Sequence, residues 1–208
     1  MQDIEAKEEP KIRAIRVIRD EHRSISAVLL GLNELARMAQ GGSRRPDFRA
    51  LRAMIRYIDE YPERLHHPKE DAYLFARLAV RWPAAKPLID DLQSEHREGA
   101  RRVRELERAL LFFEEAWPNG GGAFLDAADG YAVFHWGHMR KEERDLLPLC
   151  ERHLNAADWQ EIDRAFSANA NPIADIEERD FANLFTRIVN LAPAPVGLGE
   201  PWKAPLSG

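Results

Sequence analysis

Two histidine-containing motifs occur twice in this chain at nearly equal spacing. A Glu-His-Arg triplet at residues 21–23 returns at residues 95–97, and a His-x-x-x-Glu pattern at residues 66–70 returns at residues 138–142. The single histidine and the first residue of the longer motif are 44 positions apart in the first copy and 42 in the second. The sequence therefore contains two related halves, each with one single histidine and one His-x-x-x-Glu motif.

This spacing suits a metal site. Residues four apart lie on one face of an α-helix, so the histidine and the glutamate of each longer motif should point the same way. Neutral imidazole and carboxylate groups are ligands for iron, manganese or zinc. Carboxylates are costly to bury without partners, and a carboxylate can bridge two ions about 3.5–4 Å apart. The six candidate ligands are His22, His66, Glu70, His96, His138 and Glu142.

Each motif has an ordinary interpretation when it is taken alone. A solitary His-x-x-x-Glu pair on a helix is usually an ion pair or a hydrogen bond, and a single histidine facing a core is usually hydrogen-bonded to a neighbour. Four histidines and two glutamates that recur in register have no such simple explanation. The repeat therefore favours a metal site over both alternatives.

Three further side chains lie within two helical turns of the longer motifs. His135 is one turn before His138 with Tyr131 a further turn away, and Glu63 holds the matching place before His66. Each could ligate a metal or hydrogen-bond to a ligand. We favour a hydrogen-bonded core histidine for His135 and core packing for Tyr131, and Glu63 could equally be a solvated charge.

His67 is the fourth additional candidate. On a regular helix it points about 100° away from its neighbour His66, which favours His66 as the ligand. Pro68 lacks an N–H group and its ring clashes with the preceding turn, so it could rotate the helix enough to exchange the two histidines. His67 therefore stays a candidate for an extra ligand or for a hydrogen-bonding role.

The elements that must position these residues are helices. Alanine, leucine, arginine and glutamate dominate, and β-branched residues never alternate with polar ones as in strands, so we expect an all-α fold. Short connections between long helices favour antiparallel neighbours, which predicts an up-down-up-down four-helix bundle. Pro62 and Pro68 should kink or break the second helix. The four expected helices span residues 11–40, about 48–80, about 87–117 and about 123–153.

The bundle is expected to occupy only part of the chain. We predict a polar N-terminal tail at residues 1–12, the bundle at 13–155, a helical extension at 156–191 and an irregular tail rich in proline and glycine at 192–208. The extension should contain two short helices, near 157–168 and 176–191, with Asn155 or Asp158 as a candidate N-cap.

Composition excludes several classes of protein. With 208 residues, 45% of them hydrophobic, and a net charge of −5, the chain fits one soluble domain with appendages and shows no footprint for nucleic acid. The sequence has no run of 18 apolar residues, so we do not expect a membrane-spanning helix. The acidic, polar start does not resemble a secretory signal, and one cysteine, Cys150, excludes an internal disulfide, so we expect a cytoplasmic protein.

The doubled pattern H…HxxxE…H…HxxxE resembles the hemerythrin-like, or HHE cation-binding, domain of bacterial type over residues 13–153. The resemblance implies two iron ions with His22, His66, His96 and His138 as terminal ligands. Glu70 and Glu142 would bridge the ions, with an oxo or hydroxo group as a third bridge. Zinc or manganese could substitute for iron at such ligands. Residues 158–199 also resemble a C-terminal extension of bacterial members.

Two departures separate this chain from the oxygen-carrying hemerythrins. Those proteins have a further histidine one turn after the single histidine of the third helix, where this chain has Ala100. Their last carboxylate is an aspartate five residues after its histidine, whereas Glu142 is four residues after His138. The departures weaken the case for a reversible oxygen carrier and favour reactivity or sensing.

The expected function is therefore to bind or sense dioxygen or a related small molecule, such as nitric oxide or peroxide, at a carboxylate-bridged di-iron site. The first alternative is a di-iron enzyme that turns over peroxide or nitric oxide. A second is an iron-responsive regulator or iron donor, and a third is a metal-free helical interaction module. The expected partner is a small diatomic ligand or peroxide; neither nucleic acid nor a membrane is expected, and a homodimer is possible.

Overall fold

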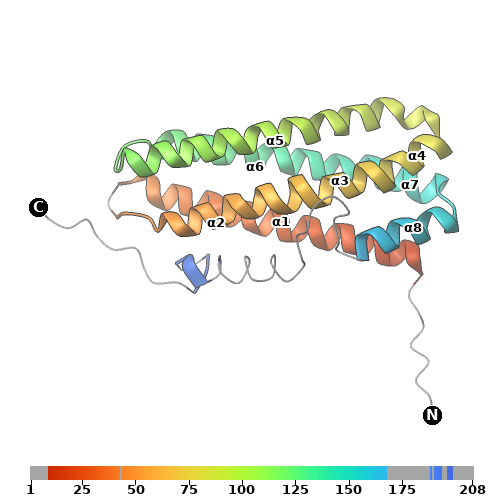
Figure 1. Ribbon diagram of the computed structural model, residues 1–208, viewed down its shortest axis with the longest axis horizontal. Coiled ribbons are helices and arrows are strands. Elements are labelled where there is room, and N and C mark those ends of the chain that lie inside the picture. Colours follow the sequence, from red (N-terminus) through yellow and green to blue (C-terminus); the bar gives the residue numbers. More distant parts are fainter. Residues whose placement is uncertain (1–8, 43, 168–187, 189, 194–195, 199–208) are drawn as a thin grey trace, which may run out of the picture.

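A computed structural model describes residues 9–42, 44–167, 188, 190–193 and 196–198, and every element assigned within these residues is helical. The all-α expectation is confirmed for them. These elements form four long helical segments, which lie side by side in Figure 1. The first is α1 (Pro10–Gln40) and the third is α5 (Lys86–Glu115). The second segment comprises α2 (Phe48–Ile58), η1 (Asp59–His66), α3 (His67–Lys69), η2 (Glu70–Phe75) and α4 (Ala76–Arg81). The fourth segment comprises α6 (Gly121–Lys141), η4 (Glu142–Leu146) and α7 (Leu147–His153).

Local sequence signals explain where these segments begin and end. Proline occupies the first turn of α1, where a missing N–H group costs nothing. Gly42, which follows the end of this helix, has a φ of 63°, a left-handed conformation that glycine adopts without strain. The carboxylate of Asp47 accepts a hydrogen bond from the backbone N–H of Arg49 and so caps the start of α2. A short 3₁₀ turn, η3 (Pro83–Ala85), links the second and third segments.

The second segment does not break at its prolines. It continues through Pro62 and Pro68, and η1 and η2, the parts that contain or follow them, are π-helical. The wider π turn is an established way for a helix to absorb an irregularity, often at a functional site. Glu70 begins η2 and Glu142 begins η4, so the internal repeat extends from the sequence to the backbone geometry.

The four segments cross a buried layer of histidine and glutamate that separates two apolar clusters. α1 and α5 each contact both α2 and α6 or their continuations, so each segment has two neighbours. One cluster contains Leu32, Met54 and Phe113, and the other contains Phe75 and Leu146. Along every segment, the candidate ligands fall between residues of one cluster and residues of the other. The polar layer is therefore enclosed by apolar side chains on both sides.

One helix outside the four segments packs on them. α8 (Ala156–Ser167) lies against α1 and corresponds to the first predicted helix of the extension. Its start is fixed by a reciprocal cap, in which Asn155 Oδ1 accepts from the N–H groups of residues 157 and 158 while Asp158 Oδ2 accepts from the N–H of Asn155. The second predicted helix, at 176–191, and the tail at 192–208 lie largely outside the described residues.

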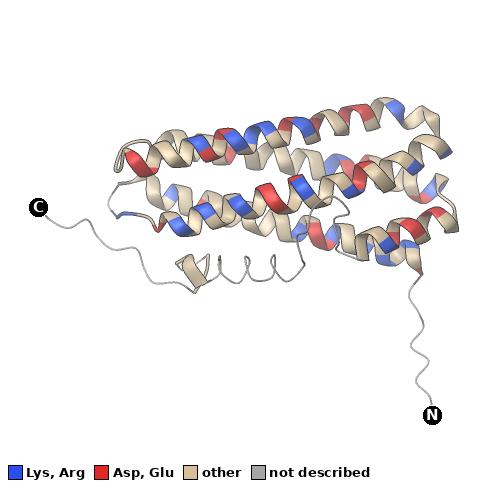
Figure 2. Cartoon of the chain, viewed as in Figure 1, with Lys and Arg blue, Asp and Glu red and all other residues tan. Residues whose placement is uncertain are grey.

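Charged side chains of both signs alternate along the segments (Figure 2). The described basic residues are therefore mixed with acidic ones along the segments. Within the part of the chain that the structure describes, no helix combines the length and the apolar character needed to cross a membrane.

Candidate metal centre

Two overlapping groups of buried side chains could each hold a metal ion. The ligating atoms within each group lie within 4.8 Å of one another, and the groups share Glu70. All their members are buried. The first group consists of His22, His66, Glu70 and Glu142, and the second of His67, Glu70, His96 and His138. The structure therefore brings together all six ligands predicted from the repeat and adds His67.

Glu70 divides its two carboxylate oxygens between two sets of histidines. Its Oε1 lies 3.3 Å from Nε2 of His66 and 3.8 Å from Nε2 of His22. Its Oε2 lies 3.6 Å from Nε2 of His96 on the other side. One carboxylate thus faces both groups at once, as a bridging ligand must.

Glu142, the equivalent residue of the second half, is divided in the same manner. Its Oε2 lies 3.4 Å from Nε2 of His22. Its Oε1 lies 3.2 Å from Nε2 of His138 and 3.7 Å from Nε2 of His96. The two glutamates therefore face each other across the layer, each with one oxygen toward His22 and one toward His96.

These separations fit the donor set of a metal ion better than a set of hydrogen bonds. Two donors that each lie about 2.1 Å from one ion are roughly 3.0–3.4 Å apart at coordination angles of about 90–109°. The shorter three of the six separations fall in this range, and the other three, at 3.6–3.8 Å, are slightly longer. Within the described residues, neither oxygen of Glu70 or Glu142 has a hydrogen-bond partner, although both side chains are almost fully buried. Such unsatisfied buried carboxylates are costly, and cations between them would remove the cost.

The outer nitrogen of every histidine in the two groups faces a carboxylate. This arrangement fixes the ring. In His22, His66, His96 and His138 it leaves Nε2 facing the two central glutamates, and Nε2 of His22 also lies 3.1 Å from Nε2 of His66. Three of the Nδ1–carboxylate contacts are hydrogen bonds and two are longer contacts. The pairs are His66–Glu21 at 2.6 Å, His22–Glu143 at 2.8 Å, His138–Glu95 at 3.0 Å, His96–Asp71 at 3.2 Å and His67–Glu63 at 3.3 Å.

Two lysines complete this outer arrangement. Lys69 donates to Glu21, and Lys141 donates to Glu95, at 2.9 and 2.6 Å. The roles of these lysines and of the two glutamates were not predicted from the sequence. A signal was nevertheless present, because each glutamate directly precedes a repeated single histidine and each lysine directly precedes a repeated ligand glutamate.

The remaining candidates lie beside the two groups rather than in them. Glu63 accepts a hydrogen bond of 2.9 Å from the Tyr131 hydroxyl and faces His67, so it is buried in the interior and not solvated. His135 is 1% exposed, and neither of its ring nitrogens has a hydrogen-bond partner in the described residues. It belongs to neither group, and its ring lies 5.4 Å from that of His67 and 5.5 Å from that of Tyr131.

Burial and charge act in opposite directions on the titration of this layer. Burial lowers the pKa of His96 and His138, but nearby carboxylates outweigh it and raise the pKa to about 9 and about 10. Burial, with neighbouring histidines, lowers the pKa of His67 and His135 well below the usual value. Burial raises the pKa of Glu63 to about 7.

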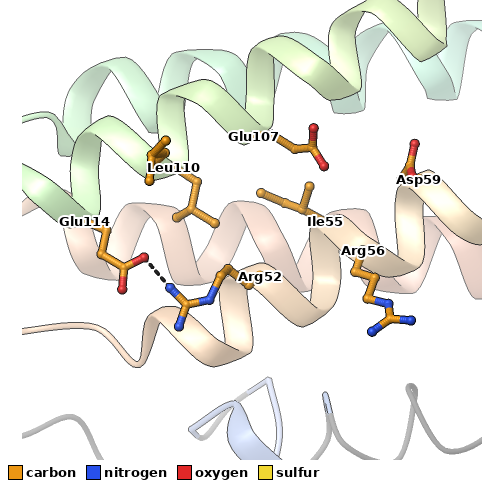
Figure 3. A pocket seen from close by; sticks show the side chains of 8 residues that line it. Arg52, Ile55, Arg56, Asp59, Glu107, Leu110 and Glu114 are labelled. Carbon is orange, nitrogen blue, oxygen red and sulfur yellow. Dashed lines mark hydrogen bonds and ion pairs between the residues drawn. The ribbon is translucent and has the colours of Figure 1, made fainter.

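Two surface cavities differ in their relation to this layer. A cavity of about 390 Å³ between α2 and α5 is lined by Ile55 and Leu110 and bordered by the Arg52–Glu114 ion pair, and no candidate ligand lines it (Figure 3). An open groove of about 680 Å³ between α1 and the fourth segment includes His22 and Glu143 in its wall. Only the second cavity leads to the histidine and glutamate layer.

A comparison with known families agrees with this geometry. Residues 13–150 match the family model of the hemerythrin HHE cation-binding domain, and this match covers more than half of the chain. No curated protein matches the chain. The matched segment contains both groups of ligands in full and ends before α8. The chain therefore belongs to the hemerythrin family through its HHE cation-binding domain.

Proposed function

We propose that the protein holds two iron ions within an up-down-up-down four-helix bundle and binds or senses dioxygen or a related small molecule, such as nitric oxide or peroxide. The observation that carries the proposal is the division of the oxygens of Glu70 and Glu142 between two sets of histidines. A single ion would not need both carboxylates to face both sets.

The ligands divide unequally between two subsites. The two-imidazole subsite would use His22 and His66, and the three-imidazole subsite would use His67, His96 and His138. Glu70, which is in both groups, and Glu142, which contacts histidines of both, would be shared. His67 would thus supply from the second segment the imidazole that oxygen-carrying hemerythrins take from the position of Ala100. The two-imidazole subsite has fewer protein donors, so a small ligand would bind at its free coordination position.

Side chains around the layer would control access to this coordination position. Ferrous iron supplies electron density to a diatomic ligand when it is bound. Ile25, Leu29 and Leu74 are at most 1% exposed and enclose the layer, so they exclude bulk water. His22, at 3% exposure, separates the interior from the groove between α1 and the fourth segment. Small molecules would enter from this groove, past His22 and its partner Glu143.

A reactivity measurement tests the proposal. Metal-free protein is reconstituted with two equivalents of ferrous iron without oxygen and then exposed in separate samples to dioxygen, nitric oxide and peroxide. We expect absorption in the near ultraviolet after dioxygen or peroxide and a distinct nitrosyl spectrum after nitric oxide. A His22→Ala, His96→Ala double variant, which lacks one ligand at each subsite, is the control and should respond to none of them.

The proposal fails if the loaded wild-type protein gives no spectral change with any of the three. Equal spectra for the wild-type protein and the double variant would also contradict it, because the response would then arise outside the centre.

A further inference from the structure

Helix α8 covers one side of the candidate metal centre. Phe166, near the end of this helix, is fully buried, and its ring centroid lies 4.8 Å from Nζ of Lys69. The same ring meets that of His66 edge-on, with the centroids 6.3 Å apart. A helix beyond the matched family domain thus touches a ligand of the two-imidazole subsite and the lysine next to a shared glutamate.

A chain of hydrogen bonds leads from this contact to the ligand. Lys69 donates to Oε1 of Glu21 at 2.9 Å, and Nδ1 of His66 donates to Oε2 of the same carboxylate at 2.6 Å. The lysine and glutamate side chains are only 2% and 6% exposed. With water excluded, each of these contacts is stronger than it is at the surface.

The second half has the equivalent contacts, but their side chains are more exposed to water. Lys141 donates to Oε1 of Glu95 at 2.6 Å, and Nδ1 of His138 lies 3.0 Å from Oε2 of that glutamate. Here the lysine and glutamate are 26% and 23% exposed, and the lysine also donates to Asp91 at 2.5 Å. The two copies share sequence and connectivity and differ in exposure to water.

α8 is fixed to the bundle at three points along its length. Its acidic residues form ion pairs with arginines of α1 and α4. These pairs are partly exposed, so each contributes little stability, but together they set the position of the helix. The pairs are Arg13–Asp163, Arg77–Glu161 and Arg81–Asp158.

We propose that α8, through Phe166 and Lys69, holds His66 in its ligating position and thereby retains the metal ion of the two-imidazole subsite. The proposal rests on the proposed function, since it requires two ions. The subsite with fewer protein donors is the one whose outer contacts the additional helix buries. α8 would therefore compensate for a missing imidazole and give the C-terminal extension a role in the metal chemistry.

The test compares metal retention by full-length variants. Wild-type protein, Phe166→Ala and Lys69→Met are loaded with ferrous iron without oxygen, dialysed against a chelator and analysed for iron. We expect two ions per chain in the wild-type protein and one in each variant, because loss of such outer contacts typically weakens metal affinity about 10- to 100-fold. Lys69→Met leaves the ring of Phe166 in place, so its iron content tests the proposal even if Phe166→Ala fails to fold.

Two matched controls isolate the role of α8. Phe134→Ala removes a similar contact elsewhere, because Arg102 lies 4.7 Å from the ring centroid of Phe134, and this variant should keep both ions. Lys141→Met changes the uncovered copy and should weaken binding less than Lys69→Met. In the Phe166→Ala background, adding His138→Ala should remove the remaining ion, whereas adding His22→Ala should leave it bound.

The outcomes separate this proposal from the proposed function. A wild-type protein that binds no iron contradicts both. Two ions in the wild-type protein and two in Phe166→Ala and Lys69→Met overturn the role of α8 and leave the proposed function standing. Simultaneous loss of both ions from these variants, or equal effects of Lys69→Met and Lys141→Met, also overturns it.

Discussion

The neighbours His66 and His67 both lie in the buried layer, at 1% and 3% exposure. On a regular helix they would point about 100° apart, and the sequence favoured only the first as a ligand. His66 ends the π-helical stretch η1, and His67 lies between η1 and the next such stretch, η2, so the local rotation differs from that of a regular helix. Pro62 and Pro68 indicated an irregularity here but did not specify π turns. The six repeated ligands could be predicted because the repeat itself marks them. His67 has no counterpart in the second half, where the equivalent residue is Met139.

His67 and His135 offer a direct comparison of a ligand with a bystander, since both are buried and lack hydrogen-bond partners among the described residues. We expect His67→Ala to weaken binding of one ion at least about tenfold, because a donor of the three-imidazole subsite is lost. His135→Ala should keep both ions, because its ring belongs to neither group. Iron content after dialysis measures both. Loss of iron from His135→Ala alone would reverse the assignment.

Among the helices, the expected limits of the four long segments agree closely with the observed ones, since glycine and proline punctuate each connection. The response of the second segment to its prolines was not foreseen. A kink or break was expected at Pro62 and Pro68; the helix does not break there and continues with π turns at residues 59–66 and 70–75. Proline removes an N–H group at a known place, whereas the way in which the chain accommodates the loss depends on packing against the other segments.

The cap of α8 provides a prediction for this helix. Asn155→Ala removes the side-chain acceptor for two backbone N–H groups and should reduce the free energy of unfolding by about 1 kcal/mol. Urea unfolding measures the change. Asn119→Ala, in the exposed loop before α6, is the matched control and should change stability by less than about 0.5 kcal/mol. Equal effects of the two substitutions would contradict the role of the cap.

For the whole molecule, the two halves share ligands, outer carboxylates, lysines and π-helical turns, and the internal repeat predicted the core of this symmetry. The asymmetry comes from α8, which covers only the first half. It could not be predicted, because it depends on a contact between residues 69 and 166, which are far apart in the sequence. A helix of the extension was expected at the right place, but nothing in its sequence states which surface it covers.

Metal removal should destabilise the whole bundle. Without ions, the buried carboxylates of Glu70 and Glu142 lack hydrogen-bond partners in the described interior. Free ion at 100 times the dissociation constant stabilises a folded protein by about 2.7 kcal/mol per site, which corresponds to a rise in Tm of roughly 5–10 °C for a chain of this size. Calorimetry of metal-free and iron-loaded protein checks this. An unchanged Tm would mean that the ions bind the unfolded chain equally well or do not bind.

The central claim is that Glu70 and Glu142 hold two ions as one bridged pair. Elemental analysis combined with Mössbauer spectroscopy of the oxidised, iron-loaded protein tests it most directly. The account predicts two iron ions per chain whose spins are coupled into a diamagnetic ground state. One ion per chain, or two ions with independent paramagnetic spectra, would contradict it.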